Sequence, residues 1–125
     1  MKSEIVTKPQ DIRERTFEFA VRIVRLCREL EREAGVSRTL ANQLLRSGTS
    51  VGANMEEEQG SQSRADFVSK TSIACKEARE THYWLRLLTA TETFPSSRLD
   101  PLTDEANQLV AILTAIIKNT KASAS

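Results

Sequence analysis

Several residue types that usually reveal a function are scarce in this 125-residue chain. It has one histidine, two cysteines, and only four phenylalanines, one tyrosine and one tryptophan. Zinc sites of the usual kind need four clustered Cys or His ligands, so this composition excludes one. Cys27 and Cys75 each lie among helix-type apolar positions, which favours free thiols in the core. A disulfide between them is the minor alternative.

The chain also lacks an excess of charge and any long apolar run. Its 18 Lys and Arg nearly balance 17 Asp and Glu, for a net charge of +1. A nucleic-acid-binding domain is usually strongly basic, so the charge balance argues against one. No stretch is long enough to span a membrane, and the first residues, MKSEIVTKPQ, lack the apolar core of a signal peptide. We therefore expect a cytoplasmic protein with no membrane partner.

Apolar residues recur at helical spacing, and strand-type alternation is missing. The pattern predicts helices at about 10–34, 38–59, 64–92 and 101–119 in a single domain, residues 1–125. Ser37, Ser63 with Asp66, and Asp100 before Pro101 have the residue types and positions of helix N-caps. Four helices with short connections predict an all-α fold, an antiparallel up-and-down four-helix bundle.

The segment RSGTSVGANMEEEQG, residues 46–60, contains two glycines inside the second predicted helix. A phosphate loop needs a preceding strand and usually a lysine, and neither is present. Two interior glycines cost a helix about 1 kcal/mol each relative to alanine. We expect close packing of another helix to offset this cost, with four residues on the packed side: Gly48, Gly52, Val51 and Met55. That helix could belong to the same chain or to another subunit.

The third predicted helix has more apolar surface than one core face requires. Its main stripe contains Phe67, Ala74, Ala78, Leu85 and Leu88. A second stripe of Ile73, Trp84 and Leu87 lies about 100–120° around the helix. These three residues either form an oligomer interface or are covered by a neighbouring helix of the same chain.

Polar residues suggest contacts between helices rather than catalysis. We expect interhelical polar contacts from five residues: Arg46, Asn54, Glu57, Glu77 and Glu80. A di-metal centre needs Glu-x-x-His pairs, and the single histidine, His82, has no glutamate at three residues' distance. No catalytic residue, metal site, cofactor or small-molecule substrate is predicted. An enzyme with an inter-subunit site of Glu57, Glu77, Glu80 and His82 is the least favoured hypothesis.

Residues 43–88, QLLRSGTSVGANMEEEQGSQSRADFVSKTSIACKEARETHYWLRLL, resemble a family of four-helix-bundle proteins. The family is that of proteins encoded in intervening sequences of bacterial 23S ribosomal RNA genes. The resemblance implies an antiparallel bundle without established enzymatic activity, and related proteins form homopentameric rings. One relative, the accessory protein of diversity-generating retroelements, is strongly basic and works with a reverse transcriptase and nucleic acid. The present chain is near neutral, and its GANMEEEQG segment is more acidic than the family pattern.

The sequence therefore favours a non-enzymatic, homo-oligomeric interaction protein, whose expected partner is itself. The alternative is an accessory protein that binds RNA or DNA. In that case an assembled ring would align four arginines of the first helix, Arg15, Arg22, Arg25 and Arg32, as a basic surface.

Overall fold

A computed structural model describes residues 11–123. The helices are α1 (Ile12–Leu30), α2 (Val36–Glu57), α3 (Arg64–Ala90) and α4 (Ser96–Ser123), and a short 3-10 helix, η1 (Glu58–Gly60), follows α2. Within residues 11–123 there is no strand. The prediction of an all-α four-helix bundle is confirmed. Pro9 and Gln10, at the predicted start of the first helix, lie outside the described residues.

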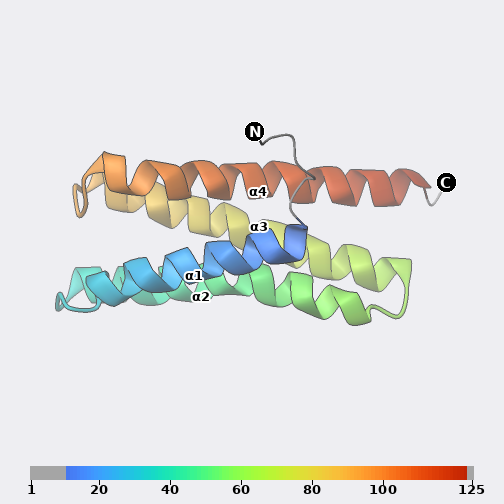
Figure 1. The fold of residues 1–125 in the computed structure, drawn as a ribbon, viewed down its shortest axis with the longest axis horizontal. Helices are drawn as coiled ribbons and strands as arrows, with labels where there is room; N and C mark the ends of the chain where they lie inside the picture. Colours follow the sequence, from blue (N-terminus) through green and yellow to red (C-terminus); the bar gives the residue numbers. More distant parts are fainter. Residues whose placement is uncertain (1–10, 124–125) are drawn as a thin grey trace, which may run out of the picture.

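The four helices run up and down, so that helices consecutive in the chain lie antiparallel and side by side (Figure 1). Contacts are extensive between α1 and α2, between α2 and α3, and between α3 and α4. The first and last helices, α1 and α4, contact one another only sparsely. Within the described part of the chain, no helix is both long enough and apolar enough to cross a bilayer.

The core consists of apolar residues spaced three and four apart on each helix. On α4 the fully or nearly fully buried residues are Leu99, Leu102, Ala106, Leu109 and Leu113. This spacing places them on one helical face. Each large side chain that is removed from water stabilises the fold by about 1.5–3 kcal/mol. Phe19 and Ile23 on α1 and Leu85 on α3 contribute to the same core.

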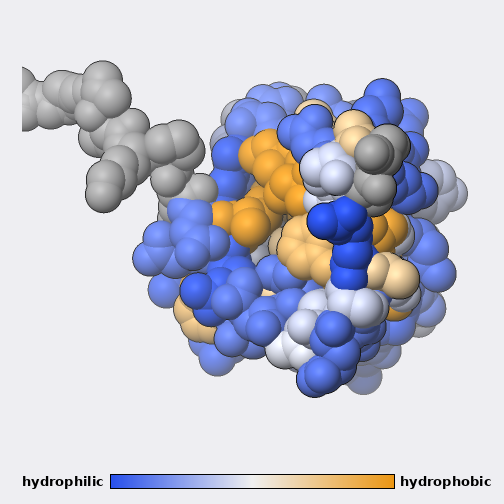
Figure 2. All heavy atoms as spheres, turned by 90° about the vertical axis from the view of Figure 1, so that its right-hand side faces the viewer, coloured by the Kyte–Doolittle hydropathy of each residue, from blue (hydrophilic) through white to orange (hydrophobic). Residues whose placement is uncertain are grey.

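The bundle is less covered at one end because α1 is the shortest helix. It has 19 residues, whereas α3 has 27 and α4 has 28, so α1 is about 12 Å shorter at 1.5 Å per residue. Hydrophobic surface gathers at the end where α2, α3 and the C-terminal half of α4 meet (Figure 2). Phe67, Ile112 and Ile116 belong to this end and are half-buried.

Two helix ends near the first turn of the bundle differ from the prediction. Helix α1 ends at Leu30 rather than at residue 34, because Leu30 is its last buried residue and Glu31–Val36 are all exposed. Helix α2 is capped by Gly35, at φ +76°, whose carbonyl accepts from the Thr39 amide at 3.1 Å. Ser37, the predicted cap, lies inside the helix.

The cap at Ser63 has the predicted geometry in part. The Ser63 hydroxyl accepts from the backbone N–H of Asp66 at 3.0 Å. The Asp66 carboxylate accepts from the backbone N–H of Gln62 at 3.3 Å, one residue before the position of a standard capping box.

Helix α4 begins at Ser96, five residues before the predicted start, so Asp100 is not its N-cap. Pro101 lies in the second turn, where its missing N–H leaves the carbonyl four residues earlier without a helical donor. Burial of Leu99, which is fully shielded from solvent, favours this extra turn. Arg98 supports it further, because its guanidinium pairs with Glu29 of α1 and lies 4.8 Å from the centre of the Phe94 ring.

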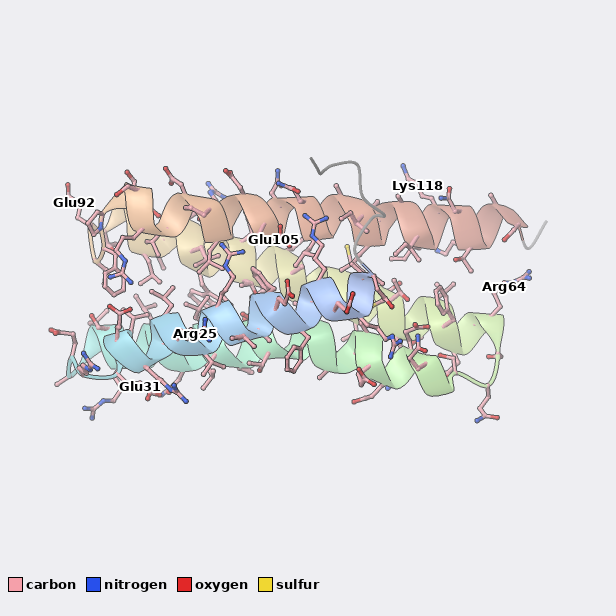
Figure 3. All side chains as sticks on the ribbon, viewed as in Figure 1. Arg25, Glu31, Arg64, Glu92, Glu105 and Lys118 are labelled. Carbon is pink, nitrogen blue, oxygen red and sulfur yellow. The ribbon has the colours of Figure 1, made fainter. Side chains whose placement is uncertain are left out.

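Helix α3 ends in a Schellman motif at the turn that leads to α4. The Thr93 N–H donates to the Leu88 carbonyl and the Glu92 N–H to the Thr89 carbonyl, both at 3.1 Å. Glu92 has φ +58° in this motif, a left-handed conformation that usually requires glycine. Figure 3 shows Glu92 at the outer end of the bundle.

Candidate interaction surfaces

The two glycines of α2 mark the closest approach between α1 and α2. A Cβ atom on Gly48 would lie 2.7 Å from Cγ2 of Ile23, and one on Gly52 would lie 3.1 Å from the carbonyl oxygen of Thr16. Val51 and Met55 are completely buried or nearly so. The helix that packs against both glycines is therefore α1 of the same chain.

Ion pairs link α2 to α3 along one edge of the bundle. The guanidinium of Arg46 donates to Glu77 at 3.2 Å and also pairs with Glu80. Closer to the α2–α3 turn, Nζ of Lys70 lies 2.8 Å from the Glu57 carboxylate, and this pair raises the pKa of Lys70. Four of the five residues predicted to make interhelical polar contacts therefore lie together on this edge.

Asn54 is the exception, and its prediction is wrong. Its side-chain amide donates to the backbone carbonyl of Ser50 at 2.9 Å and to the Ser50 hydroxyl at 3.1 Å, both within α2. The short amide reaches back along its own helix at a spacing of four residues, where it satisfies its donors locally. The buried polar contact between α2 and α3 is instead made by Thr81, whose hydroxyl donates to that of Ser47 at 2.9 Å.

The second apolar stripe of α3 is partly covered within the chain. Ile73 is 38% exposed, whereas Trp84 and Leu87 are half-buried. The Trp84 indole packs against the core and donates to the Glu80 carboxylate at 2.9 Å. Its neighbour Tyr83 is 52% exposed and meets the indole edge to face, with ring centres 5.1 Å apart. Sequence reasoning missed this exposed ring.

One of the four arginines predicted to form a basic surface on α1 pairs with α4. Arg15 donates to both carboxylate oxygens of Glu105 on α4, at 2.7 and 2.8 Å, and to Gln108 at 2.6 Å. The hydrogen bond that Arg15 donates to Glu105 raises the pKa of Arg15, and this arginine links α1 to α4. Arg22, Arg25 and Arg32 are exposed. Figure 3 shows Arg25 on α1 and Glu105 on α4.

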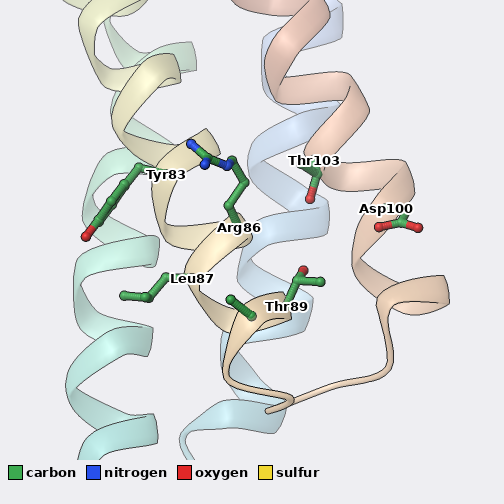
Figure 4. Close-up of a pocket in the computed structure, with 7 residues that line it drawn as sticks. Tyr83, Arg86, Leu87, Thr89, Asp100 and Thr103 are labelled. Atoms are coloured by element: carbon green, nitrogen blue, oxygen red, sulfur yellow. The ribbon is translucent and has the colours of Figure 1, made fainter.

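The surface shared by α3 and α4, called the groove below, is hollowed in two places. Toward the C-terminal end of α4 it has a hollow of about 430 Å³, lined by Ser72, Cys75, Lys76, Arg79, Thr114, Ile117 and Lys118. Toward the α3–α4 turn it has a hollow of about 400 Å³, lined by Tyr83, Arg86, Leu87, Thr89, Ala90, Asp100 and Thr103 (Figure 4). Three cations, Lys76, Arg79 and Lys118, are among the residues that line the first hollow, and Arg86 of α3 and Asp100 of α4 both line the second.

The groove cations were not assigned to one surface by sequence reasoning. The sequence nevertheless contains a signal for this surface. Residues 76, 79, 83 and 86 recur at steps of three and four, which places them on one side of a helix.

The remaining reactive side chains do not form a catalytic group. Burial raises the pKa of the Cys27 thiol to about 12, and its Sγ lies 3.5 Å from the Ala41 carbonyl oxygen. Cys27 and Cys75 are both free and buried. His82 follows Glu80 by two residues and is therefore about 200° around α3 from it. Within residues 11–123, no three His, Cys, Asp or Glu side chains gather as the ligands of a metal ion would.

Comparison with known proteins shows which family and which kind of solved structure the chain resembles. A family model described as 23S rRNA-intervening sequence protein matches residues 8–115. The chain is also similar to a crystal structure of a protein with unknown function from the S23 ribosomal protein family of Bacteroides thetaiotaomicron VPI-5482. The two share 43% sequence identity with a TM-score of 0.80, over 86% of this chain and 99% of that one. No curated protein gives a significant match.

Proposed function

The chain belongs to the 23S rRNA-intervening sequence protein family, and from this premise we propose that it is a non-enzymatic protein that assembles with copies of itself. The assembly is a homopentamer, as the family resemblance implies, and it serves as an interaction or scaffold module. It acts in the cytoplasm and requires no membrane, cofactor or small-molecule substrate.

The observation that carries this proposal is exposed apolar surface on two different sides of the bundle. Phe17 of α1 is 67% exposed, in a shallow hollow with Arg13, Glu14, Glu18 and Glu56. On α3, Ile73 is exposed and Leu87 is half-buried. A cyclic ring with more than two subunits joins one surface of each subunit to a different surface of the next. Apolar side chains on separate faces meet this requirement.

Sedimentation of the wild-type chain tests the assembly directly. The monomer mass is 14.0 kDa, so a pentamer sediments at five times that mass. Phe17→Ser and Ile73→Ser should each shift the protein toward the monomer, because each removes apolar contact area from one side of the same interface. Val36→Ser is the matched control, since Val36 is 76% exposed and lies on neither surface. A wild-type protein that sediments as a monomer would refute the proposal.

The glutamates that could form an inter-subunit active site are already bound by cations, which supports the non-enzymatic part of the proposal. Glu77 and Glu80 are bound by Arg46, and Glu57 is bound by Lys70. These cations neutralise the carboxylates that an inter-subunit site with His82 would need. We expect purified protein to contain no stoichiometric metal by elemental analysis. A bound metal that disappears in Glu77→Gln would favour the enzyme hypothesis instead.

A second candidate function is that of an accessory protein that binds RNA or DNA. The specific observation that favours it is the number of exposed cations without a carboxylate partner in the described chain, including Arg79 and Arg86 on α3. Binding to phosphates releases counterions and is therefore weakened by salt. Retention of a labelled RNA on a filter should fall as salt is raised, and absence of retention even at low salt would exclude this candidate.

A further inference from the structure

We infer that the groove between α3 and α4 binds a single strand of nucleic acid. Lys76, Arg79 and Arg86 contact its phosphates, and Tyr83 stacks on a base. This inference rests on the second candidate function and assigns it to a surface other than the α1 arginines.

The first argument is the separation of charge on α3. Beyond its first turn, this helix has only two acidic residues, Glu77 and Glu80. Both face α2, where Arg46 binds them. Arg79 and Arg86 lie about 100–120° around α3 from Glu80, and Lys76 lies about 40° from it. The cations of α3 therefore extend from beside the bound carboxylate of Glu80 toward α4: Lys76, Arg79 and Arg86. All three are exposed, and none forms an ion pair within the described chain.

The second argument is that α4 extends the basic surface across the groove. Lys118 lines the same hollow as Lys76 and Arg79, and so do Ser72 and Thr114, which have hydroxyl groups. No acidic residue lines this hollow. Hydroxyl groups and cations are the side chains that commonly contact phosphate oxygens.

The third argument is the aromatic ring placed among these cations. Tyr83 lies between Arg79 and Arg86 in the helical repeat, and its ring is held on one side by the edge of Trp84. More than half of the Tyr83 side chain remains exposed. Proteins that bind single strands combine a basic groove with aromatic rings on which bases stack. An acidic peptide would pair with the cations but would have no base to stack on Tyr83.

The groove also has a defined acidic end. Asp100 of α4 lines the hollow near the α3–α4 turn, which Arg86 lines from α3 (Figure 4). Its carboxylate repels phosphates, so the strand ends near Arg86. The basic segment from Lys76 to Arg86 is about 15 Å long at 1.5 Å per residue.

Fluorescence anisotropy with a labelled oligothymidylate of about twelve nucleotides, a length within known single-strand site sizes, tests this site. The groove variant is Lys76→Gln/Arg79→Gln/Arg86→Gln in the full chain. The matched control is Arg22→Gln/Arg25→Gln/Arg32→Gln on α1, which removes the same charge from equally exposed positions. Helical circular dichroism checks that both variants remain folded.

We expect the wild-type affinity to fall about fiftyfold between 50 and 200 mM salt, for four phosphate contacts in which Lys118 joins the three cations of α3. The groove variant should bind weakly, with a salt slope smaller by about 2, while the α1 variant keeps most of its affinity. Tyr83→Leu should weaken binding by about fivefold or more without changing that slope.

The other possible outcomes of this experiment contradict either the site alone or the second candidate function as well. If the α1 variant loses binding and the groove variant keeps it, this site is wrong and the second candidate function stands. Equal losses in both variants would attribute binding to overall charge and would also refute the site. If an oligoglutamate of similar length competes as well as the oligonucleotide, the groove binds acidic protein segments instead. A wild-type protein that binds no oligonucleotide at low salt refutes both the site and the second candidate function.

Discussion

At the scale of single residues, Gly48 is a position where the bundle has no room for a side chain. Its missing side chain is what allows Ile23 of α1 to approach α2, and Ile23 is itself completely buried. Even the Cβ atom of Ile23 would lie 3.2 Å from an added Cβ, so rotating the Ile23 side chain does not relieve the contact.

We predict that Gly48→Ala lowers the free energy of unfolding by about 1 kcal/mol. Alanine gains about 1 kcal/mol of helix propensity, but forcing a methyl group into this site costs more, within the 1–3 kcal/mol typical of overpacking. Urea denaturation followed by circular dichroism measures the change. Gly60→Ala is the control, because nothing lies within 4 Å of its added Cβ.

A double variant separates overpacking from other causes. In an Ile23→Ala background the space beside Gly48 is empty, so Gly48→Ala should become neutral or stabilising there. If Gly48→Ala costs the same in both backgrounds, the two residues are not coupled and the explanation fails.

At the scale of helices, the ends of α3 and α4 show which signals decide where a helix begins or stops. Glu92 terminates α3 in a left-handed conformation, which costs a residue with a side chain about 1–2 kcal/mol. The hydrogen bonds of the Schellman motif offset this cost.

We therefore predict that Glu92→Gly raises the free energy of unfolding by about 1 kcal/mol, since glycine adopts this conformation without a steric penalty. The measurement is again a urea midpoint. Glu31→Gly is the matched control, because Glu31 ends α1 at φ −69°, where glycine has no advantage. Equal effects at the two positions would contradict this account.

The helices could be predicted from sequence because their apolar residues repeat over several turns. Their ends could not, because an end depends on a few residues with opposing effects. At α4 the Asp100–Pro101 pair has the pattern of a helix start, yet burial of Leu99 outweighs it. Sequence spacing likewise placed Gly48 and Gly52 on a packed face but could not identify α1 as the neighbour. The groove needs both α3 and α4 in place, so no single helix predicts it.

At the scale of the whole molecule, the sparse contact between α1 and α4 is supplemented by two ion pairs. Arg15 pairs with Glu105 toward the start of α1, and Arg98 pairs with Glu29 toward its end. In the second pair, two hydrogen bonds of 2.8 and 3.0 Å join the guanidinium to the carboxylate and lower the pKa of Glu29.

The lowered pKa of Glu29 determines how the stability of the folded protein changes with pH. The folded state favours ionised Glu29, so the stabilisation is present above the ordinary pKa of 4.5 and is lost as pH falls through the lowered value. We predict that Glu29→Gln lowers the urea midpoint at about pH 7 and that the difference from wild type shrinks toward about pH 3. Glu33→Gln, at an exposed position in the α1–α2 turn, should have the same urea midpoint as wild type at every pH in this range. A difference that stays constant with pH would exclude this ion pair as its cause.

The sparse contact between α1 and α4 also affects the order in which the helices pack during synthesis. Extensive packing occurs only between helices that follow one another in the chain. Chains dominated by such local contacts fold quickly, because little loop entropy is lost before a contact forms. As each helix after α1 leaves the ribosome, a helix that it packs against has already been made. Gly48 can therefore meet Ile23 before α3 exists. The two ion pairs to α4 then form last, when the chain is complete.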